Sequence, residues 1–242
     1  MHPADLGWIA CVPAGEYDGL LQKFPALRRQ IIRNTAFEGG YAMVAYMEVK
    51  TRNKLFHETM EALEVHGGRV SDDIFFKLHY DRWRAFGEGA AQSDALNIFE
   101  CAFMQNHVNE LLFWRNADDE AVIAHHQRLL DCVRQLSPVL IYLSQPDVRQ
   151  TILRVAEERP GWMERVIAYS ETSEYGKRSG IQGFEGAMEF FELRKRLEQK
   201  LLTQLDIPYI IIENPNYDWD DVWAKITAYL TDIQQKEKNP CP

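Results

Sequence analysis

Residues 138–165 read PVLIYLSQPDVRQTILRVAEERPGWMER, and this stretch carries the clearest structural signal of the chain. Its apolar run at 139–143 is short and rich in β-branched and aromatic residues, which indicates a buried strand. The helix expected next carries four arginines, Arg149, Arg154, Arg159 and Arg165. Guanidinium groups bind phosphate oxygens through paired hydrogen bonds and stay charged at cellular pH. A strand that leads into an arginine-bearing helix therefore indicates a site for a phosphorylated ligand.

Two more short apolar runs predict strands, at 96–99 (LNIF) and 207–212 (IPYIII). Stretches with a helical spacing of apolar residues lie between the three runs, at 121–136 and 184–205, and another follows at 219–233. Alternation of short strands with long helices is typical of a parallel sheet. The predicted fold class is therefore α/β, a three-layer parallel sheet with helices on both faces.

The first part of the chain, residues 1–90, is expected to be mainly helical. Apolar residues have helical spacing over 18–33, and a further helix is expected over 42–65. A clearer helix begins at Ser71 or Asp72, either of which is a suitable N-cap, and it ends at Gly87.

We expect one domain over residues 1–242, made of the helical region at 1–90, a strand-and-helix core at 91–235 and a tail at 236–242. Hydrophobic residues at 46% and charged residues at 26% are ordinary for a globular protein. The net charge of −9 argues against nucleic acid or an anionic membrane as a partner. The expected partner is a small phosphorylated ligand or nucleotide, and a homo-oligomer stays open.

No apolar run reaches the length of a membrane span, and the N-terminus lacks the pattern of a signal peptide. The cysteines show neither a CxxC pair nor a spacing to histidine that is typical of a metal site. They are interpreted as reduced thiols, and a cytoplasmic location is expected. His125 and His126 are adjacent within an expected helix, where only one of two neighbours can face a given ligand, so the histidines indicate no site.

Ligands of parallel sheets bind beyond the carboxyl ends of the strands, so the residues after each expected strand are candidates. Glu100 is a candidate base or magnesium partner, with a helix cap or a pair with Arg82 as the alternative. Gln105 is a candidate for binding a base edge, or it faces solvent. Asn214 is a candidate contact to a nucleobase, although a turn with Pro215 is the favoured interpretation.

Arg154 and Arg159 are candidates for binding phosphate, but their spacing does not place them on one helical face. They meet at one ligand only if the helix ends near Glu158 or if a lid closes. On the residues alone, a solvated and salt-bridged helix is the favoured alternative. Lys177 and Arg178 lie in a glycine-rich segment that either clamps phosphate through backbone N–H groups or is an ordinary surface loop.

Four segments together resemble a family of bacterial P-loop NTPases that are similar in layout to thymidylate and deoxynucleoside kinases. They are FECAFMQNHVNELLF (99–113), PVLIYLSQPDVRQTILRVAEER (138–159), YGKRSGIQGFEGAMEFFELRKRLE (175–198) and IPYIIIENPNYDWDDV (207–222). The resemblance implies phosphoryl transfer from a nucleoside triphosphate to a small acceptor. It implies that Glu100 is the base or magnesium partner and that Arg154 and Arg159 are lid arginines.

The nucleotide-binding set that we expect comprises Gln105, Arg82, Arg165, Lys177, Arg178 and Asn214. Among these, Arg82 is the candidate for an arginine that the kinases carry directly after the acidic residue. This chain has Cys101 at that position, so the resemblance leaves the arginine's role unfilled or gives it to another residue such as Arg82.

The chain departs from the family because it contains no G-x-x-x-x-G-K-[ST] phosphate loop. Its Gly-Lys pair, Gly176-Lys177, is followed by Arg178 where Ser or Thr is required. The expected fold is thus P-loop NTPase-like with the first strand and phosphate loop missing. Three explanations stay open: a segment upstream of Met1, a chain that has become a binding or regulatory protein, or a partner that supplies the strand.

The expected function is that of a nucleoside or nucleotide kinase-like protein that is inactive without this loop. The alternative is a non-catalytic nucleotide-sensing or protein-interaction module, and whether the chain is an enzyme stays open. Mg²⁺ with ATP is expected as a cofactor only if the phosphate loop is present, and otherwise none is expected.

Overall fold

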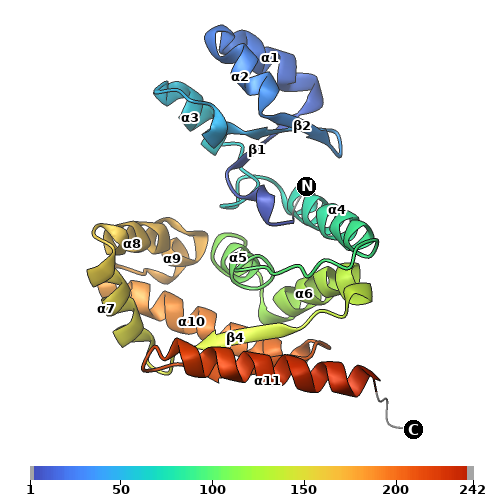
Figure 1. Ribbon diagram of the computed structural model, residues 1–242. Helices are drawn as coiled ribbons and strands as arrows, with labels where there is room; N and C mark the ends of the chain where they lie inside the picture. Colours follow the sequence, from blue (N-terminus) through green and yellow to red (C-terminus); the bar gives the residue numbers. More distant parts are fainter. Residues whose placement is uncertain (1–2, 239–242) are drawn as a thin grey trace. The chain divides into compact units, whose positions relative to one another are not determined.

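The computed structural model describes residues 3–238, which form two compact units (Figure 1). The first unit comprises Met1–Leu136 and Ser173–Tyr175, and the second comprises Ser137–Thr172 and Gly176–Pro242. The described residues are mostly helical, with a three-stranded antiparallel sheet in the first unit and a two-stranded parallel sheet in the second. The predicted three-layer parallel sheet is therefore wrong, because the described strands form no extended parallel sheet.

The antiparallel sheet and its helices make up the amino-terminal part of the first unit. The elements are η1 (Pro3–Leu6), β1 (Ile9–Pro13), η2 (Ala14–Glu16), α1 (Tyr17–Lys23), η3 (Pro25–Leu27), α2 (Arg28–Arg33), β2 (Thr35–Glu38), β3 (Tyr41–Ala45), η4 (Tyr46–Glu48) and α3 (Lys54–Glu61). The strand order is β1-β3-β2. Gly39 and Gly40 join β2 to β3 with φ angles of +59° and +91°, which suit glycine in a two-residue hairpin turn.

Strand β3 corrects the helix that the sequence predicts over 42–65. Ala42, Met43 and Val44 are all buried in this central strand of the sheet. A strand that is buried on both faces has a continuous apolar run, and periodicity cannot distinguish such a run from a buried helix. Only a later part of the range is helical, as α3, where the side chain of Asn53 caps the helix by accepting from the N–H of Phe56.

The remainder of the first unit is helical. Its elements are α4 (Asp72–Ala90), α5 (Gln105–Asn109), the π-helical turn η5 (Glu110–Trp114), α6 (Asp119–Val133) and η6 (Arg134–Leu136). The side chain of Ser71 caps α4 as predicted, by accepting from the N–H of Ile74. Helix α4 packs along α6, and the apolar interface contains Tyr80, Trp83, Leu129 and Val133.

The apolar run at 96–99 is not a strand, which corrects a second expectation. It belongs to an irregular segment between α4 and α5, and the side chains of Leu96 and Ile98 are 85% and 82% exposed. A strand needs a hydrogen-bonding neighbour, and no described strand pairs with this run. The strand that was expected to end at Glu100 is therefore absent from the described residues.

The second unit combines the parallel strand pair with four long helices. Its elements are β4 (Leu140–Ser144), α7 (Val148–Glu158), α8 (Trp162–Thr172), α10 (Gly183–Gln204), β5 (Tyr209–Glu213) and α11 (Trp219–Lys238), with the short α9 (Glu174–Ser179) before α10. Strands β4 and β5 confirm two of the three predicted strands, and their register pairs Ser144 with Glu213. Helices α7, α8 and α10 share an apolar cluster around Ile152, Met188 and Phe191.

Candidate functional site

The carboxyl ends of β4 and β5 are tied together by polar contacts. The backbone N–H of Asn214 donates to the carbonyl oxygen of Ser144 over 3.3 Å, and Nε2 of Gln145 donates to the carbonyl oxygen of Asn214 over 2.9 Å. Because parallel strands end at the same edge of a sheet, these residues stand where ligands bind in parallel sheets. This edge is the part of the second unit where the predicted residues can be tested against geometry.

Asn214 has the most unusual environment at this edge. The residue is only 7% exposed, and its Oδ1 atom accepts from the N–H of Asp218 over 2.7 Å. Its Nδ2 atom is buried and has no hydrogen-bond partner within residues 3–238. A buried donor without an acceptor costs about 1–3 kcal/mol. The amide of Asn214 is thus able to donate a hydrogen bond to a ligand oxygen and to regain that energy.

Arg154 lies against the turn that carries Asn214. Its guanidinium carbon is 3.6 Å from the ring centroid of Tyr217, and its Nε atom donates to Glu158 over 3.0 Å. Tyr217 has a φ angle of 57°, and its N–H donates to the carbonyl oxygen of Asn214 over 3.3 Å. The hydrogen bond to Glu158 raises the pKa of Arg154, with Tyr217 adding to the effect. The guanidinium is therefore held charged and flat against an aromatic ring.

A second cation reaches the same edge from α10. The Nζ atom of Lys195 donates to the carbonyl oxygen of Gln145, and it lies 3.4 Å from the carbonyl oxygen of Pro146. Asp147 begins α7 as predicted, because its side chain accepts from the N–H of Gln150. We call the group Gln145, Arg154, Lys195, Asn214 and Tyr217 the strand-end site.

Arg159 and Arg165 flank the turn between α7 and α8. Helix α7 ends at Glu158 and Arg159 is its C-cap residue, so the helix ends where the lid hypothesis requires. Gly161, with a φ angle of +73°, forms the turn, and a Cβ atom there would lie 3.4 Å from Nη1 of Arg165. Both arginines are exposed, and neither takes part in the contacts given above for the strand-end site. The structure thus brings together Arg154 and Asn214 and leaves Arg159 and Arg165 at the helix turn.

Lys177 and Arg178 belong to helix α9, and not to the loop that the glycine-rich sequence suggests. Both are exposed, and Lys177 lines a shallow pocket with Gly180 and Gly183 before α10. The N–H of Gly183 donates to Oε1 of Glu171 over 2.8 Å. A carboxylate therefore already binds a backbone N–H at the start of α10, where a phosphate clamp was considered.

Three predicted residues, Arg82, Glu100 and Gln105, belong to the first unit. Arg82 is buried and forms an ion pair with Glu38, with Nη2 3.0 Å from Oε2, so it does not pair with Glu100 as the alternative supposed. Glu100 is exposed in the irregular segment and accepts from Sγ of Cys101. Gln105 is the first residue of α5 and is half-buried. None of the three is in contact with a group that identifies a ligand.

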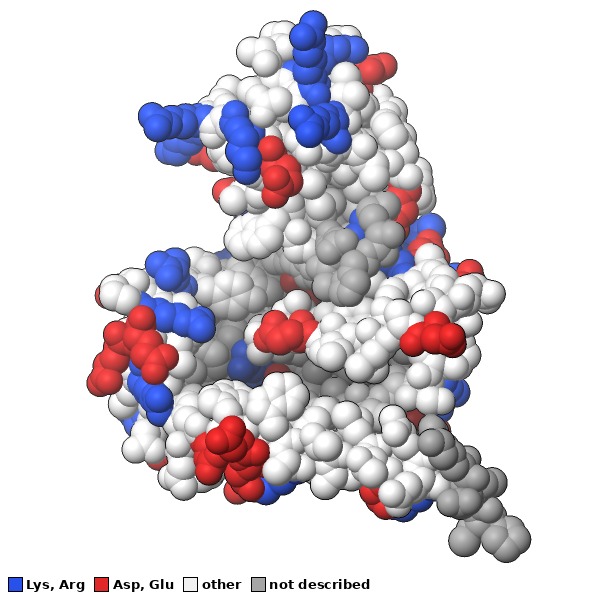
Figure 2. Space-filling view, in the orientation of Figure 1, with Lys and Arg blue, Asp and Glu red and all other residues white. Residues whose placement is uncertain are grey.

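Basic side chains also occur away from the predicted residues. Figure 2 shows Lys and Arg side chains gathered over α1, α2 and α3 on the face drawn, with acidic side chains among them. Two of these lysines form exposed pairs, Lys50 with Glu48 at 3.8 Å and Lys54 with Glu58 at 3.4 Å. Exposed pairs of this kind stabilise a fold by less than about 1 kcal/mol.

Sequence reasoning missed a cluster of five buried or half-buried histidines in the first unit. The members are His66 before α4, His79 in α4, His107 in α5, and His125 and His126 in α6. The one available signal was that His125 and His126 have the helical spacing of the apolar positions Val122 and Leu129 in α6. Contacts between residues so far apart in sequence leave no local pattern, so the cluster itself was not predictable.

A chain of hydrogen bonds runs through the histidine cluster. The hydroxyl group of Tyr80 lies 2.8 Å from Nδ1 of His125, and Nε2 of His125 lies 3.0 Å from Nδ1 of His107. The ring centroid of His79 is 4.5 Å from that of His107 and 5.3 Å from that of His66. Neither ring nitrogen of His79 has a hydrogen-bond partner among the described residues.

Burial keeps these imidazoles neutral. It lowers the pKa of His66, and it lowers the pKa values of His79, His107 and His125 well below the ordinary value. Burial also lowers the pKa of His126 to about 4. Desolvation disfavours the charged form of an imidazole, so the cluster is stable only while it holds few protons.

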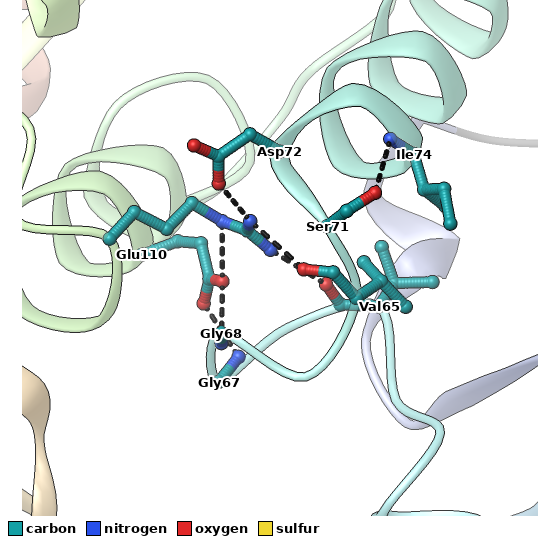
Figure 3. Close-up of polar contacts among 9 residues, drawn as sticks. Val65, Gly67, Gly68, Ser71, Asp72, Ile74 and Glu110 are labelled. Carbon is teal, nitrogen blue, oxygen red and sulfur yellow. Dashed lines mark hydrogen bonds and ion pairs between the residues drawn. The ribbon is translucent and has the colours of Figure 1, made fainter.

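The loop that carries His66 is fixed by a buried ion pair (Figure 3). The two carboxylate oxygens of Glu110 accept from the N–H groups of Gly67 and Gly68 over 2.7 and 2.9 Å, and Nε of Arg115 donates to Oε1 over 3.0 Å. The guanidinium of Arg115 also donates to Oδ1 of Asp72 over 2.6 Å. Since both members of the pair are well supplied with partners, the pair is structural.

The described residues contain no group of three or more His, Cys, Asp or Glu side chains that is arranged to hold a metal ion. The donor set around Glu100 in particular does not fit Mg²⁺, since its neighbour is a thiol. Over the part of the chain that the structure describes, no helix is both long and apolar enough to cross a membrane.

Comparisons with known proteins give no relative. No protein-family model matches the chain, and neither the characterised proteins nor the solved structures contain a match to it.

Proposed function

We propose that the second unit binds a small phosphorylated ligand of the nucleotide class at the strand-end site, and that this chain senses the ligand without transferring its phosphoryl group. The observation that carries the proposal is the pairing of a stacked guanidinium, that of Arg154, with a buried amide donor that lacks an acceptor, that of Asn214. Both belong to one turn at the carboxyl ends of two parallel strands.

The charges and donors at the site suit a phosphate group. Arg154 offers a guanidinium in a fixed orientation, and Lys195 adds an ammonium group near Gln145. Guanidinium and ammonium groups are the usual partners of phosphate oxygens. The amide of Asn214 suits either a phosphate oxygen or the carbonyl oxygen of a base.

Binding without transfer is favoured by what this chain contains. Phosphoryl transfer depends on a cradle of backbone N–H groups, a lysine and a magnesium ion. The sequence has no G-x-x-x-x-G-K-[ST] loop, and the residues around Glu100 do not fit Mg²⁺. We therefore assign no step to a metal ion, and the expected partner is the phosphorylated ligand alone.

Titration calorimetry of the full chain with ATP, AMP and inorganic phosphate tests the proposal. We expect AMP or ATP to bind, and Arg154→Ala to weaken that binding by about tenfold or more, since a charge-assisted contact contributes about 1.5–3 kcal/mol. Asn214→Asp keeps the acceptor for the N–H of Asp218 but replaces the donor with a negative charge, so it should abolish binding.

Arg196→Ala is the matched control, because Arg196 is an exposed arginine next to Lys195 and takes no part in the strand-end contacts described above. Its affinity should equal that of the unchanged protein. If none of the three probes binds, or if Arg154→Ala and Asn214→Asp bind as the control does, the strand-end site has no such role.

A further inference from the structure

The histidines of this chain are confined to one of its units. The sequence contains seven histidines, and all of them precede Leu136 in the first unit. The second unit contains none. Histidine is the side chain whose ordinary pKa makes it change charge between about pH 5 and 8. Mild acid therefore acts mainly on the first unit.

Five of these histidines meet where three helices pack together. His79 is contributed by α4, His107 by α5 and His125 by α6, and ring centroids are separated by 4.5 Å for His79 and His107 and by 4.8 Å for His107 and His125. His125 is bound to both Tyr80 and His107, so the hydrogen bonds join α4, α6 and α5 in turn. The packing of α4 on the other two helices thus runs through neutral imidazoles.

We propose that the first unit contains an acid-triggered switch, in which protons taken up by the histidine cluster separate α4 from α5 and α6. The neutral cluster holds the three helices together, and the protonated cluster does not. The second unit keeps its structure over the same range of pH.

The charged groups around the cluster oppose protonation. His79 faces Arg82 of its own helix, Arg115 after η5, and the imidazoles of His66 and His125. His125 faces Arg115 and also Arg128 of α6. A proton on His79 or His125 therefore meets cations from α4, α6 and the segment after η5, and like charges at such distances repel in a buried site.

Nearby carboxylates do not offset these cations at His79. Glu110 of η5 acts on His66, but its oxygens already accept from Gly67, Gly68 and Arg115. Glu38 of β2 is engaged by Arg82. Both ring nitrogens of His79 lack partners in the described part of the chain, so its imidazolium would also be without an acceptor.

The direction of the pH effect follows from the lowered pKa values of the cluster. An unfolded histidine titrates near pH 6.5, whereas these groups titrate lower in the closed state, so the open state binds more protons. The closed state has its full stability above about pH 6.5 and loses it as the pH falls from there towards the lowered values. Each such histidine raises the opening constant by up to about tenfold per pH unit.

Hydrogen exchange of the full chain, read peptide by peptide at pH 7.0 and 5.5 and corrected for the intrinsic exchange rate, tests the switch. Peptides of α4, α5 and α6 should exchange at least about tenfold faster at the lower pH. Peptides of α10 and β5 should keep their protection. Equal loss in both units would show general acid unfolding and would overturn the proposal.

His79→Phe is the decisive variant, because it places an uncharged ring among the aromatic neighbours Phe75, His66 and His107. It should reduce the acid-induced loss of protection in α4 by several-fold. His57→Gln is the control, since His57 belongs to α3 and contacts Tyr46 and Phe56 away from the cluster. It should respond to acid as the unchanged protein does.

The unchanged protein gives a second measurement that needs no variant. The slope of the logarithm of the opening constant against pH, between pH 6.5 and 5.5, equals the number of protons taken up on opening. We expect roughly two or more. A slope below about one, or a His79→Phe protein that opens in acid as readily as the His57→Gln protein, would rule the switch out.

Discussion

A Cβ atom at Gly87 of α4 would stand 2.2 Å from the carbonyl oxygen of Cys132 and 2.7 Å from Nε2 of Gln135. The two helices α4 and α6 therefore approach each other so closely at this point that only a residue without a side chain fits. The same pair of helices carries His79 and His125, so this close approach helps to hold the histidine cluster together. Glycine is used here for space, because its φ angle is not in the left-handed region.

Gly87→Ala should lower the free energy of unfolding of the first unit by about 2–3 kcal/mol, because the added methyl group forces the backbones of α4 and α6 apart. Gly89→Ala in the same helix is the matched control, since a Cβ atom there meets nothing within 4 Å. That change should stabilise the protein by about 0.5–1 kcal/mol through helix propensity. Urea unfolding followed by circular dichroism measures both, and equal effects would contradict the close contact.

Glu110→Gln should destabilise the first unit by about 3–5 kcal/mol, since it leaves the buried guanidinium of Arg115 without a full counter-charge. The side chains of Glu110 and Arg115 are only 3% and 4% exposed, so water does not replace the lost partner. Glu58→Gln, which breaks the exposed pair with Lys54, should cost less than about 0.5 kcal/mol. If the two variants unfold at the same urea concentration, the buried pair does not stabilise the 65–72 loop.

The cysteines should differ in their reactivity towards iodoacetamide at pH 8. Burial, with Glu38 adding to it, raises the pKa of Cys11 to about 11, so only about one thiol in a thousand is a thiolate at that pH. Cys101 is half-buried and should be alkylated much faster. Mass spectrometry of peptides taken over time gives both rates. Alkylation of Cys11 at the rate of Cys101 in the folded protein would show that β1 opens readily.

The second unit should respond to acid in the sense opposite to the first. Burial raises the pKa of Glu198, against the lowering effects of Arg194 and of the hydrogen bond from Tyr142. The folded state then holds its proton more tightly than the unfolded state, so stability rises as the pH falls through the raised value towards 4.5. Peptides of α10 should exchange more slowly as the pH falls, after correction for the intrinsic rate.

Glu198→Gln should remove this gain, whereas Glu189→Gln, at an exposed position of the same helix, should keep it. A gain that persists in Glu198→Gln would place the titrating group elsewhere in the unit.

Several local features of the second unit were predictable because they depend on neighbouring residues. The apolar runs predict β4 and β5, Asp147 predicts the start of α7, and Pro160 predicts its end at Glu158. These features place Arg154 and Asn214 on elements that end at one edge of a sheet. Their contact through Tyr217 was not predictable, because the turn at 214–217 acquires its left-handed residue only in the folded chain.

The sequence by itself determined where helices are capped and broken and which short runs favour strands, because those preferences are set by residues within a few positions of each other. The tertiary structure alone decided that the run at 96–99 has no strand partner and that the run at 41–45 lies in a sheet and not in a helix. It also decided that Glu110 binds the N–H of Gly67, 43 positions away, and that Tyr80 meets His125, 45 positions away. Such contacts depend on which surfaces pack together, and a buried imidazole has the same sequence context as an exposed one.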